Sequence, residues 1–149
     1  QASSLDLTAS YNYNKTEVTR IAPNPAALTA LGANLERIGR DERGRIEEGT
    51  PRDKFALNAA WNLDRWDFNL GATRYGEFTT RYAETAAAIR QVDQTYGAKW
   101  VIDASANFRP DQSWTLTLGA DNLLDEDYET AAFYNQPGRG FYLTVRYEP

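Results

Sequence analysis

The 149-residue chain contains no cysteine, no histidine and no methionine. Without cysteine it has no disulfide framework and no thiolate ligand for a metal ion. Without histidine it lacks the usual general base, the commonest neutral metal ligand and the usual partner of a nucleophilic serine. We therefore expect no catalytic residue, no metal site, no cofactor and no enzymatic activity. Because the chain begins at Gln1 and has no methionine, we also expect it to be a processed or excised piece.

Two further features are missing. The 16 basic and 21 acidic residues give a net charge of −5 and are interleaved, whereas a nucleic-acid surface presents a clustered basic face. No apolar run approaches the roughly 20 residues that a membrane-spanning helix needs. The sequence therefore predicts neither a nucleic-acid partner nor a transmembrane helix.

Six segments alternate apolar and polar residues with a period of two, as β-strands with unlike faces do. In the first, Leu5, Leu7 and Tyr11 fall on one face and Asp6 and Asn12 on the other. The polar faces hold Asn, Ser, Thr and Asp, which suits a wet interior in contact with other protein. The six segments are residues 5–14, 55–62, 66–73, 100–109, 114–121 and 141–147.

The connections between these segments alternate in length. Residues 62–65 and 109–113 form short turns, whereas residues 15–54, 74–99 and 122–140 form long excursions. A barrel across an outer membrane has this arrangement, with short periplasmic turns and long extracellular loops. We therefore predict an all-β, antiparallel, up-and-down transmembrane β-barrel segment of about six strands.

Aromatic residues are placed as such a barrel requires, since its girdles lie at the two membrane interfaces. Most of the aromatic residues flank the short turns. A smaller group, which includes Tyr11 and Tyr13, lies at the opposite strand ends. The predicted girdle residues are Trp61, Trp66, Trp100, Phe108, Trp114 and Tyr147.

A soluble β-sandwich or an adhesin-like binding protein without a transport role is the alternative. Its apolar faces would meet in a core and would explain the alternation equally well. It does not explain tryptophan on both sides of a short turn. Six strands cannot close a barrel, because the smallest have eight, so the barrel reading requires neighbouring strands or oligomerisation.

Three aspartates and a glutamate lie within residues 121–128, "DNLLDEDY". A calcium loop of the EF-hand type needs glycine at its sixth position. Counting from Asp121 that position is Glu126, and counting from Asp125 it is Thr130. We therefore interpret the stretch as a strand end that passes into a polar loop.

The segments "NLLDEDY", residues 122–128, and "PGRGFYLTVRYEP", residues 137–149, together resemble the C-terminal signature of TonB-dependent outer-membrane receptors. The matching residues are Asn122, Leu123, Asp125, Tyr128, Pro137, Gly138 and Arg139. Pro149 stands where the family commonly ends in an aromatic residue.

The resemblance implies that residues 1–149 are the C-terminal part of a larger barrel in the outer membrane of a Gram-negative bacterium, without its plug domain. The implied function is import of a scarce ligand: siderophore-bound iron, cobalamin or a saccharide. The implied partners are outer-membrane lipid, the remaining barrel strands, the N-terminal plug, the TonB system acting through that plug, and the ligand.

The long connections supply the candidate ligand contacts. Asn24 and Pro25 predict the start of a helix. Apolar residues recur at helical spacing after them, at Leu28, Leu31, Leu35 and Ile38, and Gly39 could end the helix. Residues 40–54 carry dense charge of both signs, which is typical of a solvated face but could also meet an anionic ligand. The predicted ligand-binding residues are Arg40, Arg43, Arg45, Tyr75, Arg81, Tyr82, Tyr128 and Tyr134.

Overall fold

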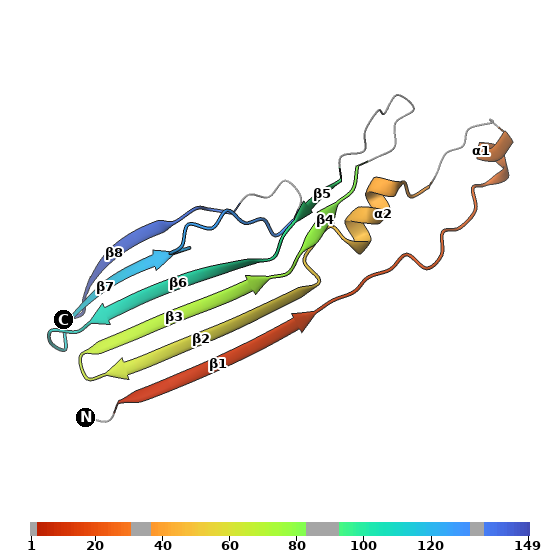
Figure 1. The fold of residues 1–149 in the computed structure, drawn as a ribbon. Helices are drawn as coiled ribbons and strands as arrows, with labels where there is room; N and C mark the ends of the chain where they lie inside the picture. The colour runs from red at the N-terminus through yellow and green to blue at the C-terminus, as the bar shows by residue number, and fades with distance from the viewer. Residues whose placement is uncertain (1–2, 31–36, 83–92, 132–135) are drawn as a thin grey trace.

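The computed structural model describes residues 3–30, 37–82, 93–131 and 136–149. Six strands form one antiparallel sheet in the order β1-β2-β3-β6-β7-β8, so each long strand pairs with the next long strand along the chain (Figure 1). Their bounds are β1 Ser4–Tyr13, β2 Asp53–Leu63, β3 Trp66–Tyr75, β6 Lys99–Phe108, β7 Trp114–Asp121 and β8 Gly140–Tyr147. All six predicted strands are confirmed, as is their up-and-down order.

Three smaller elements lie in the long connections. Helices α1 (Ala26–Ala30) and α2 (Arg40–Glu47) follow β1, and a hairpin of β4 (Phe78–Thr80) and β5 (Gln94–Tyr96) follows β3. Figure 1 shows them all beyond the same end of the sheet. Among the described residues, no helix is long and apolar enough to cross a bilayer.

The prediction of one helix from residue 25 to residue 38 is wrong at its end. The helix begins at Ala26, with the Leu28 and Thr29 amides donating to the Pro25 carbonyl. Residues 31–36 lie outside the described residues, and Arg37 and Ile38 are not helical.

The charged run after Gly39 is not simply a solvated loop, because its first eight residues form α2. Two side-chain pairs along the helix stabilise it: Arg43 with Glu47 at 3.1 Å and Arg45 with Glu42 at 2.6 Å. Acidic residues in its first turn also suit the helix dipole.

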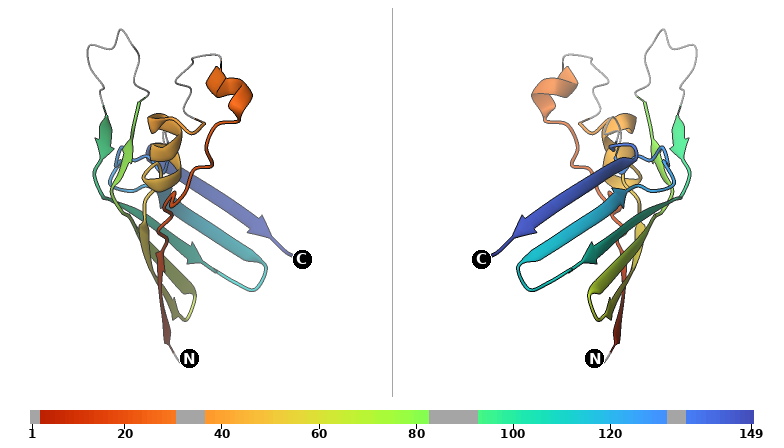
Figure 2. Two further views of the ribbon diagram at one scale, coloured as in Figure 1. Left: turned by 90° about the vertical axis from the view of Figure 1, so that its right-hand side faces the viewer. Right: turned by 90° about the vertical axis from the view of Figure 1, so that its left-hand side faces the viewer.

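The apolar side of the sheet packs against no other part of the described chain. Leu7, Leu118, Phe141 and Leu143 are each 61–71% exposed. The soluble-sandwich alternative is therefore wrong, because it needs two sheets whose apolar faces meet, and the six strands form a single sheet. Figure 2 shows that the sheet is twisted and open, with β1 and β8 at separate edges.

The predicted girdle residues gather at the two ends of this apolar side. At the turn end, Trp66 packs on Phe108 with ring centroids 4.5 Å apart, and Trp114 packs on Tyr147 at 4.8 Å. Trp61 is 5.8 Å from Phe68 at the same level. At the opposite end, Trp100 meets Phe55 at 6.1 Å. Their placement at membrane interfaces stays a prediction.

Quenching by brominated lipid tests that prediction. In a barrel whose other tryptophans are replaced by phenylalanine, we expect Trp61, Trp66 and Trp114 to be quenched by lipid. Because they lie at one strand end, bromine near the headgroups should quench them more than bromine at the bilayer centre. Quenching by aqueous acrylamide but by neither lipid would contradict the girdle. Leu63→Trp provides a control, because it places the single tryptophan directly beside the turn, at the outer limit of the predicted girdle.

Candidate functional site

The two ends of the sheet are built differently. At one end Leu63 pairs with Trp66 across a two-residue turn, in which Asp64 takes the left-handed backbone conformation at φ 52°. At the other end lie the described parts of all three long connections (Figure 1). Any binding site formed by loops therefore lies at this second end, which we call the loop end.

Ion pairs join α2 to the β4–β5 hairpin. The two terminal guanidinium nitrogens of Arg40 donate to the Asp93 carboxylate, at 2.7 and 2.5 Å. Arg81 donates to the same carboxylate at 2.8 Å and to Glu48 at 2.7 Å. The hydrogen bond from Arg40 is the main reason that the pKa of Asp93 falls to about 2, so Asp93 is charged at every physiological pH.

Backbone contacts support the same junction. The Thr79 amide of β4 donates to the Glu48 carbonyl at 3.0 Å. Gly44, buried in α2, lies so close to Arg81 that an added Cβ would be 2.7 Å from the Arg81 Cβ. The Val18 amide donates to the Glu47 carboxylate at 2.8 Å and lowers the pKa of that group.

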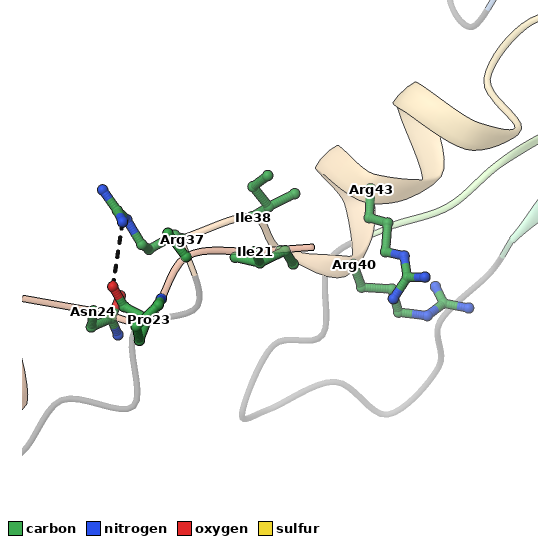
Figure 3. Close-up of a pocket in the computed structure, with 9 residues that line it drawn as sticks. Ile21, Pro23, Asn24, Arg37, Ile38, Arg40 and Arg43 are labelled. Atoms are coloured by element: carbon green, nitrogen blue, oxygen red, sulfur yellow. Dashed lines mark hydrogen bonds between the residues drawn. The ribbon is translucent and has the colours of Figure 1, made fainter. Parts of the chain in front are cut away.

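A hollow of about 510 Å³ lies beside α2 (Figure 3). Arg37 lies on one of its walls and donates to the Pro23 carbonyl at 3.4 Å, and Figure 3 shows Arg40 and Arg43 together on another. Guanidinium groups beside apolar carbon suit an anion with an apolar surface. The lining residues are Ile21, Ala22, Pro23, Asn24, Arg37, Ile38, Gly39, Arg40 and Arg43.

The loop after β7 is organised by Asn122, which is 3% exposed and takes the left-handed conformation at φ 48°. Its side-chain amide donates to the Glu126 carbonyl at 2.8 Å, and its side-chain oxygen accepts from the Glu126 amide at 2.9 Å. Its own backbone amide donates to the Asp103 carboxylate at 2.8 Å. One buried side chain thus closes the turn and attaches it to β6.

Asp125 connects the two halves of the C-terminal sequence signature. It also has a left-handed backbone, at φ 57°. Its carboxylate accepts from the Arg139 amide at 2.9 Å, just before β8. The acidic stretch therefore folds a loop, and among the described residues no group of three or more acidic side chains could hold a metal ion.

The polar side of the sheet brings together the side chains predicted to face an interior. A polar hollow of about 160 Å³ lies there, and the Tyr142 ring covers Gly119 so closely that a Cβ at position 119 would overlap it. Its lining residues are Asn58, Asn69, Gly71, Asp103, Ala104, Ser105, Asp121 and Tyr142.

Most of the sequence that forms this sheet matches a known protein family. The family described as TonB dependent receptor-like, beta-barrel matches residues 2–123. This chain belongs to that family. The six strands are therefore part of a receptor barrel, which confirms the fold class predicted from strand alternation.

Individual relatives agree with this assignment. The chain is 26% identical over 108 residues to the vitamin B12 transporter BtuB of Vibrio cholerae (strain O395), which is 72% of this chain and 17% of that protein. It is 29% identical over 101 residues to BtuB of Vibrio vulnificus, covering 64% of this chain and 15% of the relative. The receptor barrel segment thus spans less than a fifth of the length of these relatives.

The ferric-catecholate import receptor Fiu from E. coli K12 has a similar fold. Its crystal structure superposes on this chain with a TM-score of 0.65, at 17% sequence identity. The superposition covers 96% of this chain and 18% of Fiu. At this identity the likeness concerns the fold alone.

The ligand-binding residues predicted for this receptor segment do not form one cluster. Arg40 and Arg81 meet at Asp93, and the Tyr82 carbonyl accepts from Arg40 at 3.1 Å. Arg43 lies at the hollow, whereas Arg45 is exposed and paired with Glu42. Their role in binding a ligand stays a prediction.

The predicted tyrosines lie apart from that junction. Tyr75 stacks on Tyr128 with centroids 5.4 Å apart, and Lys54 lies 4.9 Å from the Tyr75 ring centre. Burial raises the pKa of Tyr128, so its phenol is uncharged at neutral pH. Tyr134 lies outside the described residues.

Three residues of the loop end were not predicted from sequence. They are Asp93, which accepts from two arginines, Glu48, and the hollow-lining Arg37. Asp93 is 53 residues from Arg40, and no periodic pattern connects positions so distant. The glycine within the charged run at position 44 was the available signal for close packing against α2.

Proposed function

We propose that this segment forms part of the wall and outer loops of an outer-membrane receptor that imports a scarce ligand. The observation that carries the proposal is the two-sided sheet. One side exposes Leu7, Leu118 and Leu143, and the other carries a polar hollow. In a receptor barrel the first side faces lipid and the second faces the lumen.

The remaining barrel strands and an N-terminal plug would complete the receptor. Asn58, Asn69 and Asp103 on the polar side are suited to hydrogen-bond a plug or water. The TonB system would act through the plug and supply the energy for import. A location in the outer membrane of a Gram-negative bacterium follows from the same assignment, and the named relatives are transporters and receptors rather than enzymes.

Two ligand classes are favoured over a saccharide. The arginine-bearing hollow beside α2 favours an anionic iron–siderophore complex, because guanidinium groups pair strongly with catecholate and carboxylate oxygens. The BtuB relatives are named for vitamin B12, which favours cobalamin.

Uptake by cells that carry the intact receptor tests the proposal. Radiolabelled cobalamin, a ferric catecholate and an oligosaccharide are offered separately, with and without a functional TonB system. We expect accumulation of one of them, reduced at least tenfold when TonB is absent. Equal uptake in both backgrounds, or uptake of none above that of receptor-deficient cells, would contradict the import role.

A further inference from the structure

The junction at the loop end joins two connections that are far apart in sequence. Helix α2 belongs to the connection between β1 and β2, and the β4–β5 hairpin belongs to the connection between β3 and β6. Four side chains form one continuous chain of ion pairs between them: Arg40 to Asp93, Asp93 to Arg81, and Arg81 to Glu48. We call these four residues the clamp.

The clamp holds α2 at both of its ends. Arg40 is the first residue of the helix, and Glu48 directly follows its last residue. Arg81 extends between them, and its Cβ, Cγ and Cδ atoms pack against Gly44 in the middle of the helix. A helix held at two ends and along its flank cannot pivot on either contact alone.

The clamp is also better shielded than the Arg45–Glu42 pair of α2. Its four side chains are 26–34% exposed, whereas those of Arg45 and Glu42 are 74% and 50% exposed. Exposed pairs contribute little because water and salt screen them, while networks with shared partners contribute more. Asp93 is such a shared partner, because it accepts from two arginines.

We propose that the clamp makes α2 and the β4–β5 hairpin a single moving unit over the loop end of the barrel. A displacement of either element then carries the other with it. Arg40 lies both in the clamp and on the wall of the hollow beside α2, so an occupant of that hollow acts directly on the hairpin. The coupling itself does not depend on which ligand, if any, the receptor imports.

Distance measurements between spin labels test the coupling. The chain has no cysteine, so labels are placed by Glu42→Cys on α2 and Gln94→Cys on β5, both exposed. The intact receptor, free of other reactive cysteines, is reconstituted in lipid and studied by pulsed dipolar EPR. We expect a single narrow distance distribution, and a distribution at least twice as wide after Asp93→Asn.

Asp41→Asn is the matched control, because Asp41 is exposed on the same helix and outside the clamp. It removes the same charge and should leave the distribution narrow. Equal broadening by Asp41→Asn and Asp93→Asn would overturn the proposal, since any loss of negative charge would then act alike. A narrow distribution after Asp93→Asn would overturn it as well.

Gly44→Ala tests the packing part of the clamp without changing charge. Alanine favours a helix over glycine, so a helix that is independent of Arg81 would only become firmer. The clamp predicts the opposite, a broader distribution, because the new methyl displaces Arg81. In the parent, 1 M salt should also broaden the distribution relative to 20 mM salt, whereas Asp93→Asn should respond at least twofold less.

Two readouts separate a failure of this proposal from a failure to fold and from a failure of the import role. The heat-dependent shift of the folded barrel on gels reports whether each variant has folded. The clamp lies outside the sheet, so its variants should still fold. Failure of ligand uptake with an unchanged distance result would remove the import role and leave the coupling intact.

Between pH 5 and pH 8 the distance distribution should be constant, because the lowered pKa of Asp93 keeps its carboxylate charged. The contribution of Asp93 is lost only as the pH falls through about 2.

Discussion

Replacing Asn122 by alanine should lower the free energy of unfolding of the receptor barrel by roughly 2–4 kcal/mol. The change removes the two hydrogen bonds that the part-buried Glu126 amide and carbonyl make with the Asn122 side chain, at 2.9 and 2.8 Å, and at a part-buried site each contributes about 0.5–1 kcal/mol. It also puts alanine at φ 48°, a conformation that costs an ordinary residue roughly 1–2 kcal/mol. Chemical denaturation of the intact barrel in lipid vesicles, followed by tryptophan fluorescence, measures the difference.

Two variants divide the effect of Asn122 between its causes. Asn122→Gly removes the hydrogen bonds and tolerates the backbone conformation, so it should be about 1 kcal/mol more stable than Asn122→Ala. Leu124→Ala changes a 58% exposed side chain of the same turn and should cost much less. If Asn122→Ala were as stable as Leu124→Ala, the buried amide would not organise the loop.

Leu143→Arg should destabilise the barrel by about 2–4 kcal/mol, the cost of arginine on the lipid face near the bilayer midplane. Leu143 is 71% exposed and lies midway along β8, opposite Leu118. In water such a position would tolerate arginine readily. The penalty therefore reports the surroundings of the apolar side directly, through denaturation in vesicles and through the yield of folded barrel.

The next residue along β8 provides the control for Leu143→Arg. Thr144 lies on the opposite side of the sheet, opposite Thr117, where arginine meets water or protein rather than hydrocarbon. Thr144→Arg should therefore cost at least 1 kcal/mol less than Leu143→Arg, within the depth dependence known for barrels. Equal costs, or a greater cost at Thr144, would mean that the apolar side does not face lipid.

The strands could be predicted from sequence because each has two unlike environments, which impose a period of two on its residues. Trp114–Asp121 was predicted to the residue. Helix α2 was missed because Arg40–Glu47 has no apolar stripe and has glycine in its middle, so its stability comes from ion pairs and from contact with Arg81. Strands β4 and β5 have three residues each, too few for a period to show.

The loop end was predicted less well for a related reason. The signature residues Asn122, Asp125 and Arg139 were found as a pattern, but their purpose is visible only in their hydrogen bonds. Arg40 and Arg81 were predicted to meet a ligand because charge alone does not reveal its partner. Asp93, which both contact, comes from a different loop, and that pairing depends on the fold.

The Tyr142 ring over Gly119 has a consequence for how this barrel changes in evolution. The two residues are cross-strand neighbours on the polar side of β7 and β8, and the ring fills the space of the missing side chain. A lineage that acquires a side chain at position 119 must give up the large ring at position 142, and a lineage that loses the ring leaves a gap. Substitutions at positions 119 and 142 should accordingly covary among related barrels. The shape of this side of the sheet should then change in discrete steps rather than gradually.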